Sequence, residues 1–144
     1  MGPSNREIAV EYADIMWNQH DLERGLTYLT PELAEETALA HVRELFDAFS
    51  DLRVDVLEPG PIAEGDYVVL RVAVSGTHDS AHFAGRPPSG KHMRWESIRI
   101  FGFEHGKIAK TWAMQDRLGL MEQLGAVTST ASEVQWATGD DEPS

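Results

Sequence analysis

The residues best suited to chemistry are an aspartate at the end of one strand pattern and an arginine within the strand pattern before it. Trp112, Met114 and Asp116 recur at every second position, which predicts that they share one face of a strand. The tryptophan and methionine assign that face to the interior. A buried carboxyl group has a raised pKa and can take up and return a proton near neutral pH. Asp116 is therefore the candidate acid/base residue, with a helix cap before Arg117, or a salt bridge to an arginine, as the alternative.

Arg99 lies in the strand pattern over residues 92 to 103, and the pattern does not decide which face points inward. One face carries the aromatic residues and Arg99, and the other carries Arg94, Glu96 and two isoleucines. If the aromatic face lines a pocket, Arg99 can neutralise an enolate or a carboxylate. An ion pair at the surface or between subunits is the alternative. The candidate substrate-binding residues, expected in the pocket wall or at its rim, are Trp17, Phe46, His78, Trp95, Arg99, Trp112 and Met114.

Three histidines flank one loop and raise the question of a metal site. His78, His82 and His92 are of a type that binds zinc, but the loop between them has no fixed geometry, so we expect no metal. His78 is expected to reach the pocket rim or to fix the loop by a hydrogen bond. The chain has no cysteine, which excludes disulfides, thiolate metal sites and a cysteine nucleophile.

The first half of the chain has the periodicity of helices. A capping box at Ser4 and Glu7 opens a helix expected over residues 6 to 18. Asp21 is the expected cap of a short second helix. A third helix is expected over residues 32 to 49, because threonine and then proline at its start are typical N-terminal signals.

The period of the apolar residues changes from 3.6 to 2 near Leu52. Helices, then an antiparallel meander, then a last helix indicate an α+β fold, in which N-terminal helices cover a curved, mainly antiparallel sheet. Such a sheet encloses a conical pocket, which is the expected place for a ligand. Strands are expected over residues 52 to 58, 67 to 77, 92 to 103 and 107 to 115, and the last helix over residues 117 to 124.

One domain is expected over residues 1–125, followed by an acidic, polar tail over residues 126–144. Val134 and Trp136 are the apolar exceptions that would let the tail dock on a subunit surface. The net charge of −12 repels phosphate backbones and anionic lipids, so neither nucleic acid nor membrane is an expected partner. The chain shows no long apolar run and no signal-peptide pattern, which together with the lack of cysteine favours a cytoplasmic location.

Seven short motifs follow one another between about residues 5 and 125, and each is weak alone because Gly-Asp and Gly-Lys pairs merely form turns. They are Asn18-Gln19-His20-Asp21, Ala48-Phe49-Ser50-Asp51-Leu52, Glu64-Gly65-Asp66, Ser75-Gly76-Thr77-His78, Gly85-x-Pro87-Pro88-x-Gly90, Gly106-Lys107-Ile108, and Trp112-x-x-x-Asp116-x-x-Gly119-Leu120 with Gln123-Leu124-Gly125. In this order they resemble the SnoaL-like polyketide cyclases of the nuclear transport factor 2-like superfamily.

The resemblance implies a cone-shaped α+β barrel that forms a homodimer or homotetramer and works without metal or organic cofactor. It also implies that Asp116 is the acid/base of an aldol-type ring closure. The substrate would be a bulky, mostly apolar, oxygenated intermediate of natural-product biosynthesis. Hydroxylation, hydration or dehydration in the same pocket is one alternative, and a noncatalytic ligand-binding or dimerisation protein is another. A sheet face bearing Arg71, Ser75 and Thr77 suits a symmetric interface.

Two departures from the resembled pattern bear on the pocket. Most relatives have an extra strand before the long helix, whereas residues 28 to 33 here pass almost directly into helix. The pocket is therefore expected to be more open on that side, or to be closed by a partner or the tail. The cyclases also pair their aspartate with a pocket histidine, and residues 94 to 103 contain none. A second polar group close to Asp116 would distinguish an enzyme from a binding protein.

Overall fold

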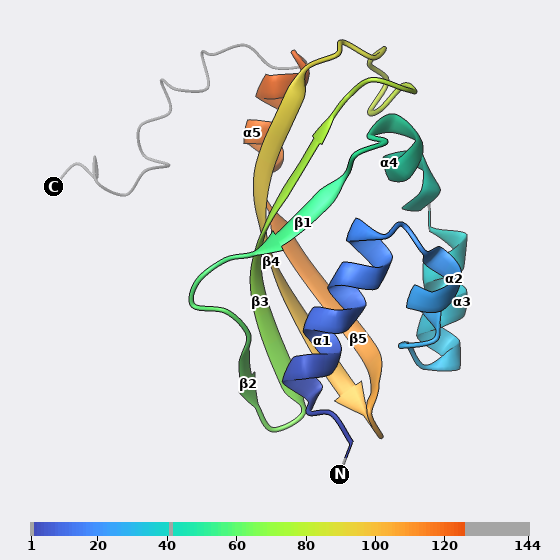
Figure 1. The fold of residues 1–144 in the computed structure, drawn as a ribbon, viewed down its shortest axis with the longest axis vertical. Helices are drawn as coiled ribbons and strands as arrows, with labels where there is room; N and C mark the ends of the chain where they lie inside the picture. The colour runs from blue at the N-terminus through green and yellow to red at the C-terminus, as the bar shows by residue number, and fades with distance from the viewer. Residues whose placement is uncertain (1, 41, 126–144) are drawn as a thin grey trace, which may run out of the picture.

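The computed structural model describes residues 2–40 and 42–125, and it shows the expected change from helices to strands (Figure 1). The predicted tail, with Val134 and Trp136, lies outside the described residues. Within the described part, no helix is both long and apolar enough to cross a lipid bilayer. The elements are α1 (Asn5–Ala13), the π-helical η1 (Asp14–Asn18), α2 (Leu22–Leu26), α3 (Pro31–Leu39), α4 (Val42–Ala48), β1 (Arg53–Val56), β2 (Ile62–Glu64), β3 (Tyr67–Thr77), β4 (His92–Glu104), β5 (Lys107–Gln115) and α5 (Arg117–Leu124).

The first helices begin where the sequence predicts. Ser4 Oγ accepts a hydrogen bond from the Glu7 backbone N–H at 3.2 Å, and Glu7 Oε1 accepts one from the Ser4 N–H at 2.8 Å. This reciprocal pair is the predicted capping box. Asp21 caps α2 by accepting a hydrogen bond from the Arg24 N–H at 3.0 Å. The turn η1 continues α1 and ends at Asn18, as expected for the first helix.

The single helix expected over residues 32 to 49 is wrong, because the chain breaks it at Ala40. Ala40 has an extended backbone, with φ −74° and ψ 156°, and it separates α3 from α4. Helix α3 buries none of its residues, whereas Ala48 at the end of α4 and Phe49 after it are 0% exposed. The break lets the second half of the segment turn toward the core. No glycine or proline between residues 37 and 43 signals it in the sequence.

The strands form one antiparallel, curved sheet in the order β1-β3-β4-β5, and the short β2 also pairs with β3. In the described chain β1 and β5 are not paired with each other, so the sheet is an open cone rather than a closed barrel. Helix α1 packs on β3, α3 on β5 and α5 on β4 (Figure 1). Between α2 and α3 the described chain forms only a one-residue parallel bridge, between Leu29 and Ile108.

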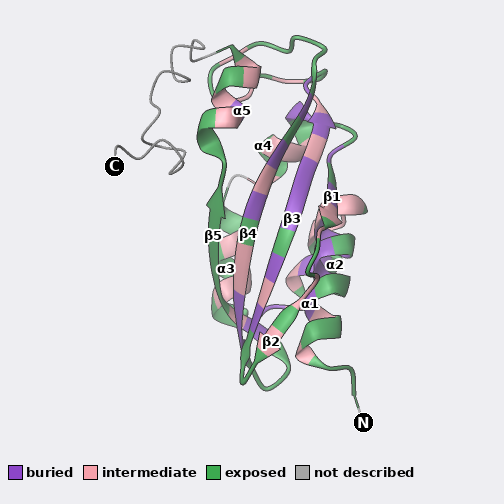
Figure 2. Cartoon of the chain, turned by 90° about the vertical axis from the view of Figure 1, so that its left-hand side faces the viewer, coloured by how far each residue is buried: buried purple, intermediate pink, exposed green. Residues whose placement is uncertain are grey.

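Strands β3 and β4 alternate between an inner face, toward the helices, and an outer face (Figure 2). In β3 the predicted inward residues are at most 2% exposed, and Arg71 points outward. In β4 the aromatic face is the inner one, whereas Ile98 on the outer face is 49% exposed. Arg99 shares the inner face, because it pairs directly with the buried Leu70. The inward residues of β3 are Val68, Leu70, Val72 and Val74.

Strand β5 does not keep a simple alternation, because a β-bulge interrupts its pairing with β4. Ile108 pairs with Phe103, but Lys110 pairs with Gly102, the very next residue of β4. Ala109 is therefore an extra residue on β5. One extra residue exchanges the two faces of a strand beyond the bulge.

The bulge overturns the predicted orientation of the end of β5. Trp112 and Met114 lie on the outer face and are 50% and 79% exposed, and Asp116 is exposed as well. The prediction that these three residues face the interior is therefore wrong. The residues that pair with the inner face of β4 are Thr111, Ala113 and Gln115.

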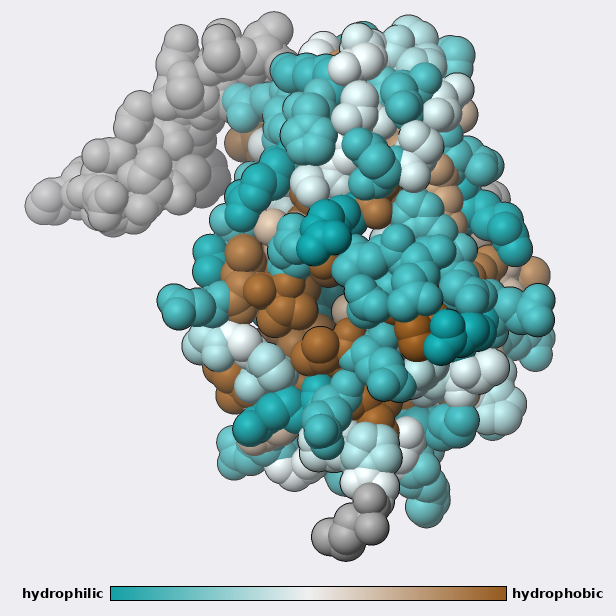
Figure 3. Space-filling model, viewed as in Figure 1, coloured by the Kyte–Doolittle hydropathy of each residue, from teal (hydrophilic) through white to brown (hydrophobic). Residues whose placement is uncertain are grey.

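The surface seen in the view of Figure 1 carries both apolar and hydrophilic residues. Apolar residues gather toward the middle of this face, and hydrophilic residues surround them (Figure 3). Among the described residues, Val56 and Ile62 are large hydrophobic residues that remain 37% and 52% exposed. Some apolar surface is normal on a folded protein, so this distribution alone identifies no site.

Candidate functional site

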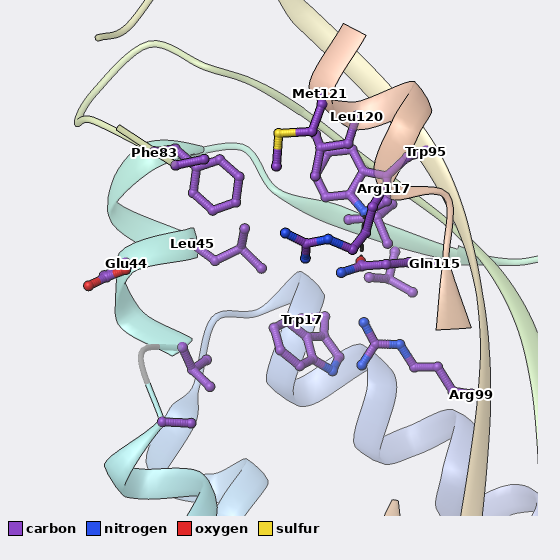
Figure 4. A pocket seen from close by; sticks show the side chains of 15 residues that line it. Trp17, Glu44, Leu45, Phe83, Trp95, Arg99, Gln115, Arg117, Leu120 and Met121 are labelled. Atoms are coloured by element: carbon purple, nitrogen blue, oxygen red, sulfur yellow. Dashed lines mark hydrogen bonds between the residues drawn. The ribbon is translucent and has the colours of Figure 1, made fainter. Parts of the chain in front are cut away.

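The inner face of the sheet and the helices enclose a cavity of about 390 Å³. Its size lies within the range typical of small-molecule sites, and most of its lining is apolar. Three of the predicted substrate-binding residues line it: Trp17 from η1, and Trp95 and Arg99 from β4 (Figure 4). The sequence therefore located part of the wall correctly.

Arg99 places a positive charge in this wall without a negative partner. Its Nε atom is buried and has no hydrogen-bond partner, and no carboxylate among the described residues forms a salt bridge with it. Its guanidinium carbon lies 5.1 Å from the centre of the Trp17 ring, in a cation–π contact. Burial lowers the pKa of Arg99 from its usual value, while the nearby Tyr12 acts in the opposite direction. Arginine remains charged at physiological pH, so this wall carries an uncompensated cation.

Gln115 and Arg117, which the sequence analysis did not select, join Arg99 at the cavity. Gln115 Oε1 accepts a hydrogen bond from Trp95 Nε1 at 3.2 Å, so the side-chain nitrogen is the end that remains for a ligand. The guanidinium of Arg117 points into the cavity, toward Leu45 (Figure 4). Both residues would have been selected if the bulge at Ala109 had been anticipated. The one signal for it in the sequence is Gly102, a glycine inside the neighbouring strand that pairs with Lys110 next to the bulge.

Glu44 on α4 is the one acidic residue among the described residues that line this cavity. It is exposed, and its carboxylate points away from Arg99 and Arg117 (Figure 4). The carboxylate of Glu44 is therefore not directed at either of the two guanidinium groups in the cavity (Figure 4).

A second cavity, of about 120 Å³, shares Trp17 and Arg99 with the main one. Tyr12 lines it and is only 5% exposed. Burial raises the pKa of Tyr12 to about 12, although the positive charge of Arg99 pulls it downward. The phenol is therefore protonated at neutral pH and can donate a hydrogen bond beside Arg99.

Asp116 is a helix cap, which is the role that the sequence analysis gave as the alternative to acid/base catalysis. Its Oδ1 accepts a hydrogen bond from the Gly119 backbone N–H at 2.8 Å, and its side chain caps α5. A Cβ atom at Gly119 would clash with Asp116 Oδ2, so glycine leaves room for this carboxylate. Asp116 does not line the main cavity.

Phe46 and His78 support the site from behind rather than line the main cavity. The Phe46 ring centre lies 5.8 Å from that of Trp17, and its other contact is a stack on His20 at 4.5 Å. His78 is 1% exposed, and its Nε2 donates a hydrogen bond to the Ala81 carbonyl oxygen at 2.8 Å. This is the loop-fixing role that the sequence left open for His78.

The remaining predicted residues lie elsewhere. Trp112 contributes to the wall of the smaller cavity, but its ring lies 6.4 Å from that of Tyr67 on the outer face. Met114 is on the outer face. Of the loop histidines, His92 contacts Thr77 Oγ1 at 3.1 Å through Nδ1. Throughout residues 2–40 and 42–125, no three potential metal ligands come together.

The comparison with known proteins extends over most of the chain. A family model described as SnoaL-like polyketide cyclase matches residues 7–124. Among curated proteins, none matches at a significant level.

Three similar solved structures have the same fold. AclR from Streptomyces galilaeus, a proposed hydroxylase, is 25% identical, with a TM-score of 0.75 over 86% of this chain and 97% of that one. TsrD from Streptomyces laurentii is 26% identical, with a TM-score of 0.71 over 88% of this chain and 99% of that one. A proposed SnoaL-like polyketide cyclase from Jannaschia sp. CCS1 is 25% identical, with a TM-score of 0.74 over 89% of this chain and 99% of that one.

Proposed function

The chain belongs to the SnoaL-like polyketide cyclase family, and from this premise we propose that it is an enzyme that closes a carbon–carbon ring in a small molecule. The proposed substrate is bulky, mostly apolar and oxygenated, as in natural-product biosynthesis. It would bind in the cavity between the sheet and the helices, with a carbonyl oxygen at Arg99. One observation carries this proposal: a guanidinium with a buried Nε and no carboxylate partner among the described residues stands in a mostly apolar cavity.

The proposed role of Arg99 is electrostatic. Ring closure removes a proton from the carbon next to a carbonyl group, and the bonding electrons move toward the carbonyl oxygen to form an enolate. A cation that is already in place, in a site with little water, stabilises this developing charge without having to reorganise. The enolate carbon then attacks a second carbonyl carbon, whose oxygen gains the negative charge and finally a proton. Tyr12 lines the adjoining smaller cavity, which shares Arg99 with the main one. Its phenol, protonated because its pKa is about 12, is the proposed donor of that proton and regains one from water.

Asp116 is not assigned the acid/base step in this proposal. Its carboxylate caps α5 on the exposed side of β5 and does not line the cavity. A methylene group between two carbonyls, as polyketide chains contain, is acidic enough to lose its proton to water once a cation stabilises the enolate. The family's cyclisation chemistry is thereby attributed to Arg99 rather than to the expected aspartate.

The proposal is tested by enolate formation itself, which needs no knowledge of the natural substrate. Benzoylacetone, a neutral aromatic 1,3-diketone, exchanges its central protons for deuterium in D2O, and NMR measures the rate. We expect the protein to accelerate this exchange, and Arg99→Gln to lose about 100- to 1,000-fold of the acceleration. Arg71→Gln, which removes the same charge from the outer face, is the matched control. No acceleration by the wild type, or a loss with Asp116→Asn but not with Arg99→Gln, would show that the proposal is wrong.

Hydroxylation is the second candidate reaction, because AclR, one of the similar structures, is a proposed hydroxylase. Mass spectrometry of the product separates the two reactions. Ring closure leaves the substrate mass unchanged or lowers it by one water, whereas hydroxylation raises it by one oxygen atom. A noncatalytic binding protein would bind such ligands without either change.

We also propose that the protein is a homodimer that pairs through the outer face of the sheet. This face exposes Tyr67, Ile98, Trp112 and Met114, each at least 49% exposed. Exposed apolar patches of this kind mark interaction sites, and twofold dimers are the commonest homo-oligomers. Light scattering should give twice the chain mass of 16.0 kDa, and Trp112→Glu should give a monomer.

The control for assembly is Leu39→Glu, at a leucine that is 77% exposed and belongs to α3 rather than to the outer face of the sheet. This variant should keep the dimer. A wild-type mass of one chain at micromolar concentration would refute the dimer.

A further inference from the structure

We infer that the substrate carries a carboxylate and that Arg117 binds it. This inference rests on the proposed function, because it assigns the second cation of the same cavity. Arg99 would face the carbonyl oxygen that becomes negative, and Arg117 would hold a group that is negative from the start. The substrate class is then an apolar monocarboxylate that also bears a carbonyl.

The position of Arg117 points to a ligand rather than to a protein partner. Arg117 is the first residue of α5, and its guanidinium points into the cavity, toward Leu45 (Figure 4). No salt bridge or hydrogen bond to its side chain occurs in the described parts of the chain. Arginine presents a planar fork of donors that fits a carboxylate through two parallel hydrogen bonds.

The start of α5 holds both a carboxylate, that of Asp116, and a guanidinium, that of Arg117. The start of a helix carries partial positive charge, so an arginine at the first position is repelled by its own helix. The Asp116 carboxylate is directed at the Gly119 N–H, where it caps the helix. Arg99, whose guanidinium also has no acidic partner among the described residues, lines the same cavity, and the Glu44 carboxylate points away from both arginines (Figure 4).

The charge of the cavity opposes the charge of the whole molecule. The chain has a net charge of −12, which repels anions in solution, yet the described lining concentrates two guanidinium groups among apolar side chains. Such surroundings strengthen an ion pair relative to water.

The two arginines differ in depth. Arg99 has a buried Nε, whereas Arg117 is exposed as a residue and stands nearer to solvent. A permanent carboxylate loses less hydration at Arg117 than at Arg99, which is why we assign it there.

The test compares two probes of the same shape, 2-naphthoate and the neutral 2-naphthamide, by isothermal titration calorimetry. We expect the wild type to bind 2-naphthoate at least about tenfold more tightly than 2-naphthamide, as one charge-assisted pair provides. Arg117→Gln should remove this preference through a loss of 2-naphthoate affinity, while 2-naphthamide, which has no charge to pair, still binds. Arg117→Lys keeps the charge but loses the fork, and should retain only part of the preference.

Arg43→Gln is the matched control, because Arg43 is an exposed arginine on α4 that does not line the cavity. It should keep the full preference. Equal affinity of the wild type for both probes would overturn the inference, as would an equal loss in Arg43→Gln, or a loss of 2-naphthamide binding in Arg117→Gln.

The failure of this inference is distinguishable from the failure of the proposed function. Deuterium exchange of benzoylacetone uses a neutral diketone and depends on Arg99 alone. Exchange without a carboxylate preference would leave the enzyme proposal standing and remove the carboxylate. A carboxylate preference without exchange would leave an anion-binding cavity and remove the catalytic proposal.

Discussion

The two faces of the sheet hold arginines in opposite circumstances. On the outer face, Arg71 Nη2 lies 2.8 Å from Glu96 Oε1, and Arg94 Nη1 lies 3.5 Å from Oε2 of the same glutamate. On the inner face, Arg99 faces the Trp17 ring and has no acidic partner among the described residues. All three arginines stand in the same pair of neighbouring strands.

The difference teaches that pairing, rather than residue type, separates a structural charge from a functional one. An exposed ion pair contributes little to stability, because water screens it. A buried cation without a partner destabilises the fold, unless a ligand supplies the missing negative charge. If the inner face is functional, its buried arginine should lower the free energy of unfolding, whereas the paired arginines of the outer face should change it little.

The largest contrast is expected between two tryptophans that the sequence treated alike. Trp95 on the inner face is 4% exposed, whereas Trp112 on the outer face is 50% exposed. Trp95→Ala should lower the free energy of unfolding by about 3–5 kcal/mol, because it leaves a cavity in the core. Trp112→Ala should lower it by less than about 1.5 kcal/mol. Urea unfolding at several protein concentrations measures both, and equal losses would abolish the contrast.

The inner arginine should oppose folding. Arg99→Met replaces an unpaired buried cation by an apolar side chain of similar length, and should raise the free energy of unfolding by about 1–4 kcal/mol. The same variant should lose the acceleration of enolate formation, because the buried cation that lowers stability is the group proposed to stabilise the enolate. Arg71→Met on the outer face should change stability little. A marked destabilisation by Arg99→Met would show that Arg99 is held by interactions of its own.

The starts of the first helices and the alternation of β3 were predictable, because local signals and an unbroken period specify them. The capping box at Ser4 and the Asp21 cap are short-range patterns, and they formed as predicted. The alternation in β3 correctly assigned Val68 to Val74, since its pairing with β4 is continuous. The inner face of β4, which its sequence left open, follows from that register.

The end of β5 was not predictable, because its orientation depends on a bulge that pairing creates. Ala109 is an ordinary residue in sequence. Gly102 on the neighbouring strand is a signal for a bulge, but it does not by itself fix the register that makes Ala109 the extra residue. The resulting exchange of faces removed Trp112 and Met114 from the predicted site and brought in Gln115. The break at Ala40 is a second case in which packing overrode a regular helical pattern.

Tyr12, a core tyrosine on α1, should make the stability of the protein depend on pH in the alkaline range. Its pKa is raised by burial from 10.0 to about 12, so the folded state keeps its proton where the unfolded chain loses it. Tyr12 therefore makes its full contribution to the free energy of unfolding below about pH 10. This contribution, about 2–3 kcal/mol, is lost as the pH rises from about 10 to 12.

Tyr12→Phe is expected to remove this part of the pH dependence. Urea unfolding at pH 9 and pH 11.5 should show a smaller loss of stability in Tyr12→Phe than in the wild type. Tyr67→Phe, at a tyrosine on the outer face that is 51% exposed, should behave like the wild type. Identical losses in all three proteins would mean that the Tyr12 phenol ionises freely in the folded state.

The smallest effect is expected at Asp116, which adjoins Gln115 but lies on the opposite side of the strand. Asp116→Ala removes the α5 cap and should lower the free energy of unfolding by about 1 kcal/mol. Asp116→Asn should cost less, because its amide oxygen can still accept the hydrogen bond from the Gly119 N–H.

These two variants also separate the cap from the acid/base role that the resemblance implied for Asp116. An asparagine cannot transfer a proton, so an acid/base would lose about 100- to 10,000-fold in rate on Asp116→Asn, whatever the stability of the variant. A residue that only caps α5 would show a small loss of stability and unchanged deuterium exchange of benzoylacetone. We expect the second result, because β5 presents Gln115, and not Asp116, to the cavity. A large loss of exchange in a stably folded Asp116→Asn would mean that the start of α5 rearranges when substrate binds, and that the outer face contributes to catalysis after all.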